Sequence, residues 1–315
     1  MKIGSSDISA AYIGSTAINK VYIGSTEVWS SYAYLLDDYT GAAAAYSLRL
    51  LRAAYTGSAI RVRRASDNAE QDIGFSNNEL DTTSLASFCS GTNGFVTTWY
   101  DQSGNGYNAT QTTAAYQPQI VSSGSVITEN GKPSVQFDGN DDNLNTASFT
   151  MTSAFSVFGA FNQTATSGFR CLISHNFVSA GNAFLTQGRW VLIRTGQTGQ
   201  DWQLNDSVLI GDGSTSNRYP RFVSNGSVFT ANTQNLVSGI LSSSTSQIWA
   251  NGSAASARVQ QTSSISSETG KVYIGSSEIY DQFQGKIQEV FIYDTDQSGN
   301  RTGIETNIND FYSIY

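Results

Sequence analysis

The segment WYDQSGNG, residues 99–106, has the pattern of a β-strand that ends in a tight turn. Asp101 is placed to accept hydrogen bonds from backbone amides two residues further along the chain. Gly104 and Gly106 supply the positive φ angles that such a turn requires. Two interpretations follow. The turn is a structural element of a β-protein, or it is a loop in which Asp101 and Asn105 contact a sugar or a metal.

The chain keeps a β-rich character on both sides of this turn, from Ile60 to about Tyr293. Short runs of alternating apolar and polar residues are separated by Gly, Asn, Ser and Asp turns. The clearest runs are 95–100, 134–137, 155–161, 189–193, 236–241, 247–250 and 286–293. Many short strands at such spacing predict a mainly β fold, either a sandwich or a barrel.

Two segments have helical spacing instead. Residues 32–55 contain an alanine run at 42–45, and the Thr-Gly pair at 56–57 predicts the end of a helix. Residues 303–315 place apolar side chains on one helical face, which predicts a terminal helix packed on the β-body. The side chains of that face are Ile304, Ile308, Phe311 and Tyr315.

The composition argues against several classes of function. The 315 residues carry a formal net charge of -8 and only 13% of them are charged, which suits an extracellular β-rich protein. Nucleic-acid binding is not expected, because it needs clustered Lys and Arg, and the basic residues at 61–64 have the spacing of a solvated strand face. We expect no membrane span, and no signal peptide at the start, so release by a route such as lysis is expected.

The first thirty residues contain three copies of a ten-residue unit with an Ile-Gly-Ser turn. Each copy predicts a β-hairpin, and three hairpins cannot bury a core of their own. Residues 1–31 are therefore predicted to be a β-segment ahead of a domain at 32–315, either a decorative edge sheet or an assembly module. The apolar side chains expected to make the assembly contacts are Ile3, Ile13, Ile23, Val28 and Trp29.

The third unit, residues 21–29, resembles a repeat found in phage virion proteins. The resemblance implies a capsid decoration protein, a head fibre or a tail-fibre component on the virion surface, assembled in the host cytoplasm. Other virion proteins are then the partners of residues 1–31, and the chain is expected to form a homo-oligomer. In a reducing cytoplasm Cys89 and Cys171 are expected to be buried and unpaired, although the sequence leaves a pair open.

Three motifs, at residues 63–74, 88–92 and 99–106, resemble in this order the catalytic domain of the arabinofuranosidase B family. The match spans about residues 46–144 and implies a jelly-roll sandwich related to the concanavalin A-like fold. Retaining cleavage needs two carboxyl groups about 5 Å apart. The family's His-Met-Glu-Ala-like segment has no counterpart here. Its Ile-Gly-Gly-Asp-like segment is best matched at 274–277, where Ser replaces the acid, and the neighbouring Glu278 is expected on the opposite strand face.

Two further segments resemble laminin-G-like domains. One is FDGNDD at 137–142, whose acidic residues either hold calcium as a cofactor or shape a turn without metal. The other is FQGKIQEVFIY at 283–293, which resembles the last strand of those domains and makes Glu289 a structural hydrogen-bonding group. The candidate calcium ligands are Asp138, Asp141 and Asp142, and the core positions expected in the last strand are Ile287, Val290 and Ile292.

The remaining candidates are aromatic. Trp190, Trp202 and Trp249 lie beside polar loops, where each either stacks on a sugar or packs in the core. His175 is expected in a loop or at a strand edge. Together the patterns predict a concanavalin A-like or laminin-G-like sandwich displayed on a particle, with cell-surface glycans as a candidate ligand. The alternatives are an arabinofuranosidase-like hydrolase and a cement protein that contacts only neighbouring subunits.

Overall fold

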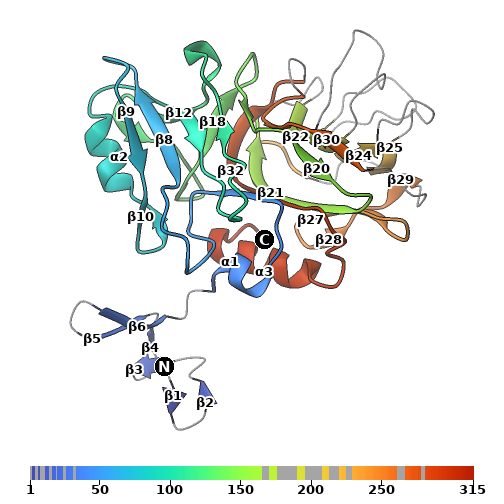
Figure 1. Cartoon of the computed structure of the whole chain (residues 1–315), viewed down its shortest axis with the longest axis horizontal. Helices are drawn as coiled ribbons and strands as arrows, with labels where there is room; N and C mark the ends of the chain where they lie inside the picture. The colour runs from blue at the N-terminus through green and yellow to red at the C-terminus, as the bar shows by residue number, and fades with distance from the viewer. Residues whose placement is uncertain are drawn as a thin grey trace.

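The computed structural model describes residues 33–164, 170–175, 229–260, 267–277 and 281–315, and elsewhere only the strands named below. The body is mainly β, as predicted, and most of its strands belong to one large antiparallel sheet that curls around an apolar core (Figure 1). The helices are α1 Leu35–Asp38, α2 Thr82–Phe88 and α3 Arg301–Tyr312, with a short 3-10 turn at Ala114–Tyr116. None of the described helices is long and apolar enough to cross a membrane.

The strands agree with the predicted runs. Those of the main sheet are β7 Ala44–Ser47, β8 Ile60–Arg64, β9 Glu70–Ile73, β12 Gly94–Trp99, β13 Ala109–Thr110, β14 Gln119–Ser122, β15 Ser125–Val126, β18 Val135–Asp138, β19 Leu144–Asn145, β21 Phe155–Gln163, β22 Arg170–His175, β23 Trp190–Thr195, β24 Val208–Asp212, β25 Pro220–Ser224, β26 Gln234–Leu241, β27 Ser246–Ala250, β28 Ser253–Ala254, β29 Ala257–Gln260, β31 Val272–Ile274 and β32 Gln284–Tyr293. Three small two-stranded sheets accompany them: β10 Phe75–Ser76 with β11 Glu79–Leu80, β16 Thr128–Glu129 with β17 Lys132–Pro133, and β20 Phe149–Met151 with β30 Glu268–Gly270.

Strand β21 shows how the sequence pattern produces the layers. It lies between β26 and β32, and all nine of its residues are buried. Phe155, Val157 and Phe161 enter the core enclosed by the sheet, whereas Phe158 and Ala160 belong to a second apolar cluster beneath α1 and α3. Both faces of the strand are therefore covered, and apolar side chains lie on each of them.

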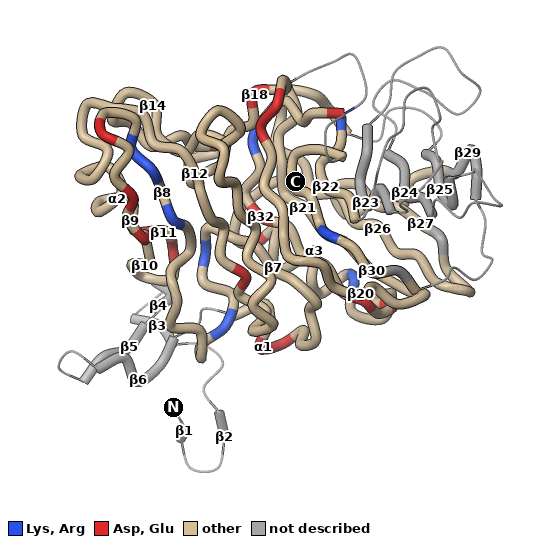
Figure 2. Tube along the Cα trace, turned by 45° about the horizontal axis from the view of Figure 1, so that its top comes forward, with Lys and Arg blue, Asp and Glu red and all other residues tan. Residues whose placement is uncertain are grey.

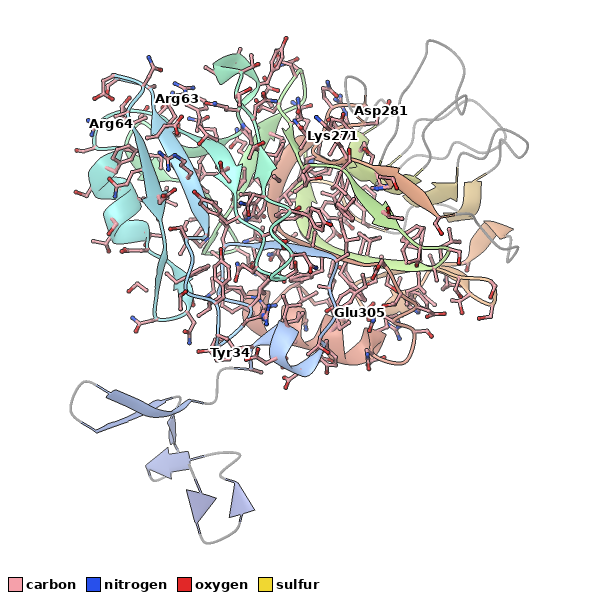
Figure 3. All side chains as sticks on the ribbon, in the orientation of Figure 1. Tyr34, Arg63, Arg64, Lys271, Asp281 and Glu305 are labelled. Carbon is pink, nitrogen blue, oxygen red and sulfur yellow. The ribbon has the colours of Figure 1, made fainter. Side chains whose placement is uncertain are left out.

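The basic residues at 61–64 form the solvated face that was predicted. They lie on β8, where Figure 2 shows the Lys and Arg positions in blue. Arg61 pairs with Glu70 and Asp72 of the neighbouring strand β9. Arg63 and Arg64 lie at the outer edge of the body, where their guanidinium groups stack on aromatic rings (Figure 3). Arg64 pairs with Asp67, whereas Arg63 donates to the side-chain oxygens of Gln117 and Asn68.

The helix predicted at residues 32–55 is wrong for most of its length. Only Leu35–Asp38 is helical, and the alanine-rich segment Ala44–Ser47 is strand β7, paired with β32. Gly41 has a φ of +84°, which breaks any helix before the alanines. The small side chains are fully enclosed, so tertiary pairing outweighs the helix propensity of alanine.

The predicted terminal helix is confirmed, but one of its four predicted packing residues, Tyr315, is exposed. Helix α3 buries Ile304 and Ile308 against the second apolar cluster, as expected. The next buried position is Tyr312. The helix ends at Ser313, which has a left-handed conformation, and Tyr315 beyond it is 53% exposed. Helix α2 was not predicted; Asp81 begins it by accepting a hydrogen bond from the Ser84 amide.

The three predicted hairpins are present in residues 2–30. Each is a two-stranded antiparallel sheet of its own. The strands are β1 Lys2–Ile3, β2 Ser6–Asp7, β3 Ala11–Ile13, β4 Thr16–Ile18, β5 Lys20–Ile23 and β6 Thr26–Ser30. The side chains of Ile3, Ile13, Ile23, Val28 and Trp29 lie outside the described residues.

Both cysteines are buried, and neither forms a disulfide within the part of the chain that the structure describes. Cys89 follows helix α2 and Cys171 lies in β22. Burial raises the pKa of the Cys89 thiol, so it is a poor nucleophile at neutral pH. The expectation that both thiols are buried is confirmed.

Candidate functional site

The carboxylate of Asp101 is the centre of the turn at residues 101–106. Its Oδ1 accepts hydrogen bonds from the amides of Ala45 and Ser103, both at 2.9 Å. Its Oδ2 accepts from the amide of Tyr107 at 3.0 Å and from the Ser103 hydroxyl at 2.7 Å. Four donors match the four lone-pair positions of a carboxylate, and Asp101 is 4% exposed. This geometry favours the structural interpretation of the turn.

Asn105 fixes the turn to strand β7 from the other side. Its Nδ2 donates to the carbonyls of Ala42 and Ala43, both at 3.0 Å. Gly104 and Gly106 have φ angles of +97° and +78°, as the sequence predicts. The motif at residues 99–106, which resembles the arabinofuranosidase B family, is therefore held to residues 42–45 by hydrogen bonds from Asp101 and Asn105.

The acidic residues at 138–142 do come together. Ligand oxygens of Asp138, Asp141 and Asp142 lie within 4.8 Å of one another. Part of their hydrogen-bonding capacity is used within the turn, since Asp138 accepts from the Asn140 amide at 2.8 Å and Asp142 from the Asp138 amide at 2.9 Å. The three carboxylates fit the span of a calcium ion's oxygen ligands, although three ligands are fewer than calcium takes.

Asp142 has a pKa far above the ordinary value of an aspartate. Burial, the charge of Asp138 and the charge of Asp141 together raise the pKa of Asp142 to about 7. The hydrogen bonds that Asp138 accepts from the turn keep its own pKa below the ordinary value. The cluster therefore holds one carboxyl group that is protonated in mildly acidic solution and charged in alkaline solution.

We expect Asp142→Asn to stabilise the protein at pH 8.5 and to have little effect at pH 5. A carboxyl whose pKa is raised by folding opposes folding once it is deprotonated, so its cost appears as the pH rises through about 7. We expect a gain of about 1–3 kcal/mol at pH 8.5, less than the full shift implies because water screens part of the site. Urea unfolding at the two pH values measures it.

The matched control is Asp310→Asn, a change at an exposed position on α3, which should behave alike at both pH values. Calcium is tested in the same experiment. If the cluster holds the ion, calcium at pH 8.5 stabilises the wild type and not Asp142→Asn. A gain from Asp142→Asn that is equal at pH 5 and pH 8.5 would contradict the assignment of the raised pKa.

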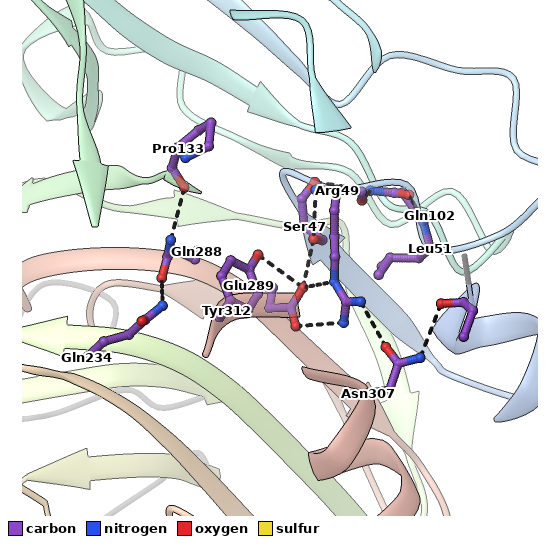
Figure 4. A network of polar contacts seen from close by, with 11 residues as sticks. Ser47, Arg49, Leu51, Gln102, Pro133, Gln234, Gln288, Glu289, Asn307 and Tyr312 are labelled. Atoms are coloured by element: carbon purple, nitrogen blue, oxygen red, sulfur yellow. Dashed lines mark hydrogen bonds and ion pairs between the residues drawn. The ribbon is translucent and has the colours of Figure 1, made fainter. Parts of the chain in front are cut away.

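A buried ion pair joins the sheet to the terminal helix (Figure 4). Arg49 and Glu289 are 2% and 0% exposed, with Arg49 Nε 2.9 Å from Oε2 and Nη2 3.1 Å from Oε1. Ser47 and Tyr312 also donate to Glu289 Oε2, at 2.8 and 3.2 Å. Arg49 Nη1 donates to Asn307 of α3 at 2.8 Å.

The predicted structural role of Glu289 is therefore confirmed, and its carboxylate is enclosed by four donor groups. Sequence reasoning missed Arg49. The available signal was a lone arginine inside the apolar run at 46–51, where a charge needs a buried partner.

The segment at 274–277 is tightly packed. Gly275 has a φ of +82°, and a Cβ there would lie 2.3 Å from the Phe137 ring. Ser276 and Ser277 are fully buried. The Ser277 hydroxyl donates to Asp281 at 3.2 Å. Glu278 lies outside the described residues.

His175 corrects an expectation. It is fully buried in β22, between β23 and β31, rather than in a loop or at an edge. Its Nε2 lies 3.1 Å from the Phe149 carbonyl, and its ring packs 5.5 Å from the Phe149 ring. Burial lowers the pKa of His175, so the ring is neutral and belongs to the core.

The tryptophan candidates are not brought together by the described residues. Trp249 on β27 is half-buried, and the Arg301 guanidinium lies 4.6 Å from its ring centroid, which covers one ring face. Trp190 belongs to β23, but its side chain lies outside the described residues. Trp202 lies outside them altogether.

Comparisons with known proteins agree with this fold. Residues 34–153, less than half of the chain, match the family described as alpha-L-arabinofuranosidase B, catalytic. No curated protein sequence matches the chain.

Two solved structures are similar at low sequence identity. One is a GH54 α-L-arabinofuranosidase soaked with a cyclic sulfate inhibitor, with a TM-score of 0.61, 17% identity and coverage of 87% of this chain and 64% of that one. The other is an arabinofuranosidase complexed with arabinofuranosyl-alpha-1,2-xylobiose, with a TM-score of 0.56, 16% identity and the same coverage of 87% and 64%. The chain thus spans 64% of the length of these structures, and at such identities the likeness shows a shared β-sandwich fold.

Proposed function

We propose that this chain is a structural protein of a phage particle, which displays a lectin-like sandwich and is held on the particle by residues 1–31. The observation that carries the proposal is the threefold hairpin repeat, in which each copy is a separate two-stranded sheet. An isolated two-stranded hairpin is marginally stable in water. The repeats therefore need a surface to pack on, which a second copy or another particle protein supplies.

The hydrogen bonds of the acidic residues in the family-like motifs favour display over catalysis. Asp101 and Glu289, the acids of two motifs that resemble sugar-processing and laminin-G-like domains, are surrounded by donors of the protein itself. Serine occupies position 277, where the resemblance to the arabinofuranosidase B family implies an acid. A sandwich that binds host glycans weakly still gains avidity when many copies share one particle.

The docking role predicts the behaviour of the double variant Ile13→Asp, Ile23→Asp. Its incorporation into particles, or its self-association, is expected to fall by about tenfold or more, because each 1.4 kcal/mol lost from an interface lowers affinity tenfold. The body should unfold at an unchanged temperature. The control is Ser15→Asp, Ser25→Asp, which adds the same charges at positions of the predicted turns. Normal incorporation of the isoleucine variant would contradict the docking role.

A second candidate, favoured by the family match of residues 34–153, is an arabinofuranosidase-like hydrolase acting on surface polysaccharide. Its test is release of nitrophenol from 4-nitrophenyl α-L-arabinofuranoside by the purified chain. Turnover that is lost in Glu278→Gln would establish this candidate. A chain that gives no turnover and binds a glycan array as assembled particles fits the display role instead.

A further inference from the structure

Three amide side chains form a row on the sheet beneath the small hairpin of β16 and β17. Asn162 comes from β21, Gln234 from β26 and Gln288 from β32. They are 6%, 9% and 0% exposed, so the row is a buried polar seam within the sheet. Buried amides need partners for both their oxygen and their nitrogen atoms.

The neighbours of Gln288 and Gln234 fix which way each amide points. Gln288 Nε2 lies 3.1 Å from the Glu129 carbonyl and 3.3 Å from the Pro133 carbonyl, so the nitrogen faces the hairpin. The oxygen of Gln288 then faces Gln234, which donates its Nε2 to it (Figure 4). The oxygen of Gln234 consequently points elsewhere.

Asn162 is oriented by a carboxylate. Its Nδ2 donates to Glu129 Oε1 at 2.8 Å, and because a carboxylate only accepts, the amide cannot be reversed. Asn162 Oδ1 and Gln234 Oε1 are both buried, and among the described residues no donor reaches either atom. Leaving a buried acceptor without a donor costs about 1–3 kcal/mol.

The two unpaired oxygens belong to side chains on one face of the sheet. Asn162 and Gln234 are directly opposed on adjacent antiparallel strands, so their side chains share a face and their Cβ atoms are about 4.5–5.5 Å apart. A single small molecule can therefore reach both oxygens. It has to supply two hydrogens or a positive charge.

The surrounding charges favour a neutral hydrogen-bond donor over a cation. Lys286, the partner of Asn162 on β32, lies 3.0 Å from Glu129 Oε2 and donates to the Thr128 carbonyl at 2.7 Å. Glu129 is thus already neutralised, and the ammonium group would repel a second cation. The seam suits a neutral molecule with two hydrogens to donate.

We propose that Asn162 Oδ1 and Gln234 Oε1 bind one buried water molecule, which donates a hydrogen bond to each. The water completes the polar seam that attaches the β16–β17 hairpin to strands β21, β26 and β32. Internal waters occupy such positions, where they satisfy two to four buried polar groups. The site is independent of the docking and glycan-binding roles.

The test is a crystal structure of the full chain, grown in rubidium chloride and refined at about 1.5 Å. We expect one spherical density peak at about 2.6–3.2 Å from both oxygens, without a rubidium anomalous signal. The Asn162→Leu variant should lose the peak, whereas the control Gln119→Leu on β14 should keep it. The proposal is overturned by an anomalous peak, which means a cation, by direct protein donors to both oxygens, or by oxygens placed as described with no peak.

Discussion

Arg49→Met is expected to lower the free energy of unfolding by about 3–5 kcal/mol. The change leaves the fully buried Glu289 carboxylate without its bidentate partner, and an uncompensated buried charge carries a cost of this size. Asn307 of α3 loses its donor as well, so the helix is loosened from the sheet. Urea unfolding monitored by circular dichroism measures the change.

Two further variants show whether burial is the cause. Arg61→Met removes an arginine of an exposed ion pair and should leave the free energy of unfolding nearly unchanged. The double variant Arg49→Met, Glu289→Leu removes both buried charges and should recover part of the lost stability. Equal losses for Arg49→Met and Arg61→Met would contradict a buried, structural ion pair.

The second large effect is expected for Asp101→Asn, which should cost about 2–4 kcal/mol. Each carboxylate oxygen of Asp101 accepts from two donors, so the amide NH2 of asparagine faces donors whichever way it turns. The loss should be equal with and without any glycan, because the residue acts on the turn. Asp310→Asn, an exposed change of the same chemistry, should be close to neutral.

This variant also separates the two interpretations of the turn. A structural Asp101 lowers the unfolding temperature and leaves the affinity of the folded fraction for glycans unchanged. If Asp101 instead contacts a ligand, Asp101→Asn would keep its stability and lose binding. Thermal unfolding and glycan-array binding of the same sample distinguish these outcomes.

Local sequence patterns predict much of the fold. Alternation along 155–161 and 286–293 predicts strands that the structure contains as β21 and β32, and helical spacing at 303–315 predicts α3. The alanines at 42–45 were misassigned because alanine favours helices by itself, and their pairing with β32 is fixed by residues about 250 positions away. Long-range pairing of this kind leaves no local periodicity.

The candidate site was less accessible to sequence reasoning. The turn chemistry of Asp101 and the clustering of Asp138, Asp141 and Asp142 follow from short spacings, so both could be predicted. The Arg49–Glu289 pair joins residues 240 positions apart, and the burial of His175 depends on strands that cover it on both sides. Neither contact has a signature in a single sequence.

The most direct test of the account is electron cryo-microscopy of the assembled particle with this chain located in it. We expect the hairpins of residues 2–30 to pack against a neighbouring chain, while the sandwich projects from the surface. A particle that lacks the chain, or hairpins that contact no neighbour, would contradict the claim that the repeats hold the sandwich to a larger assembly.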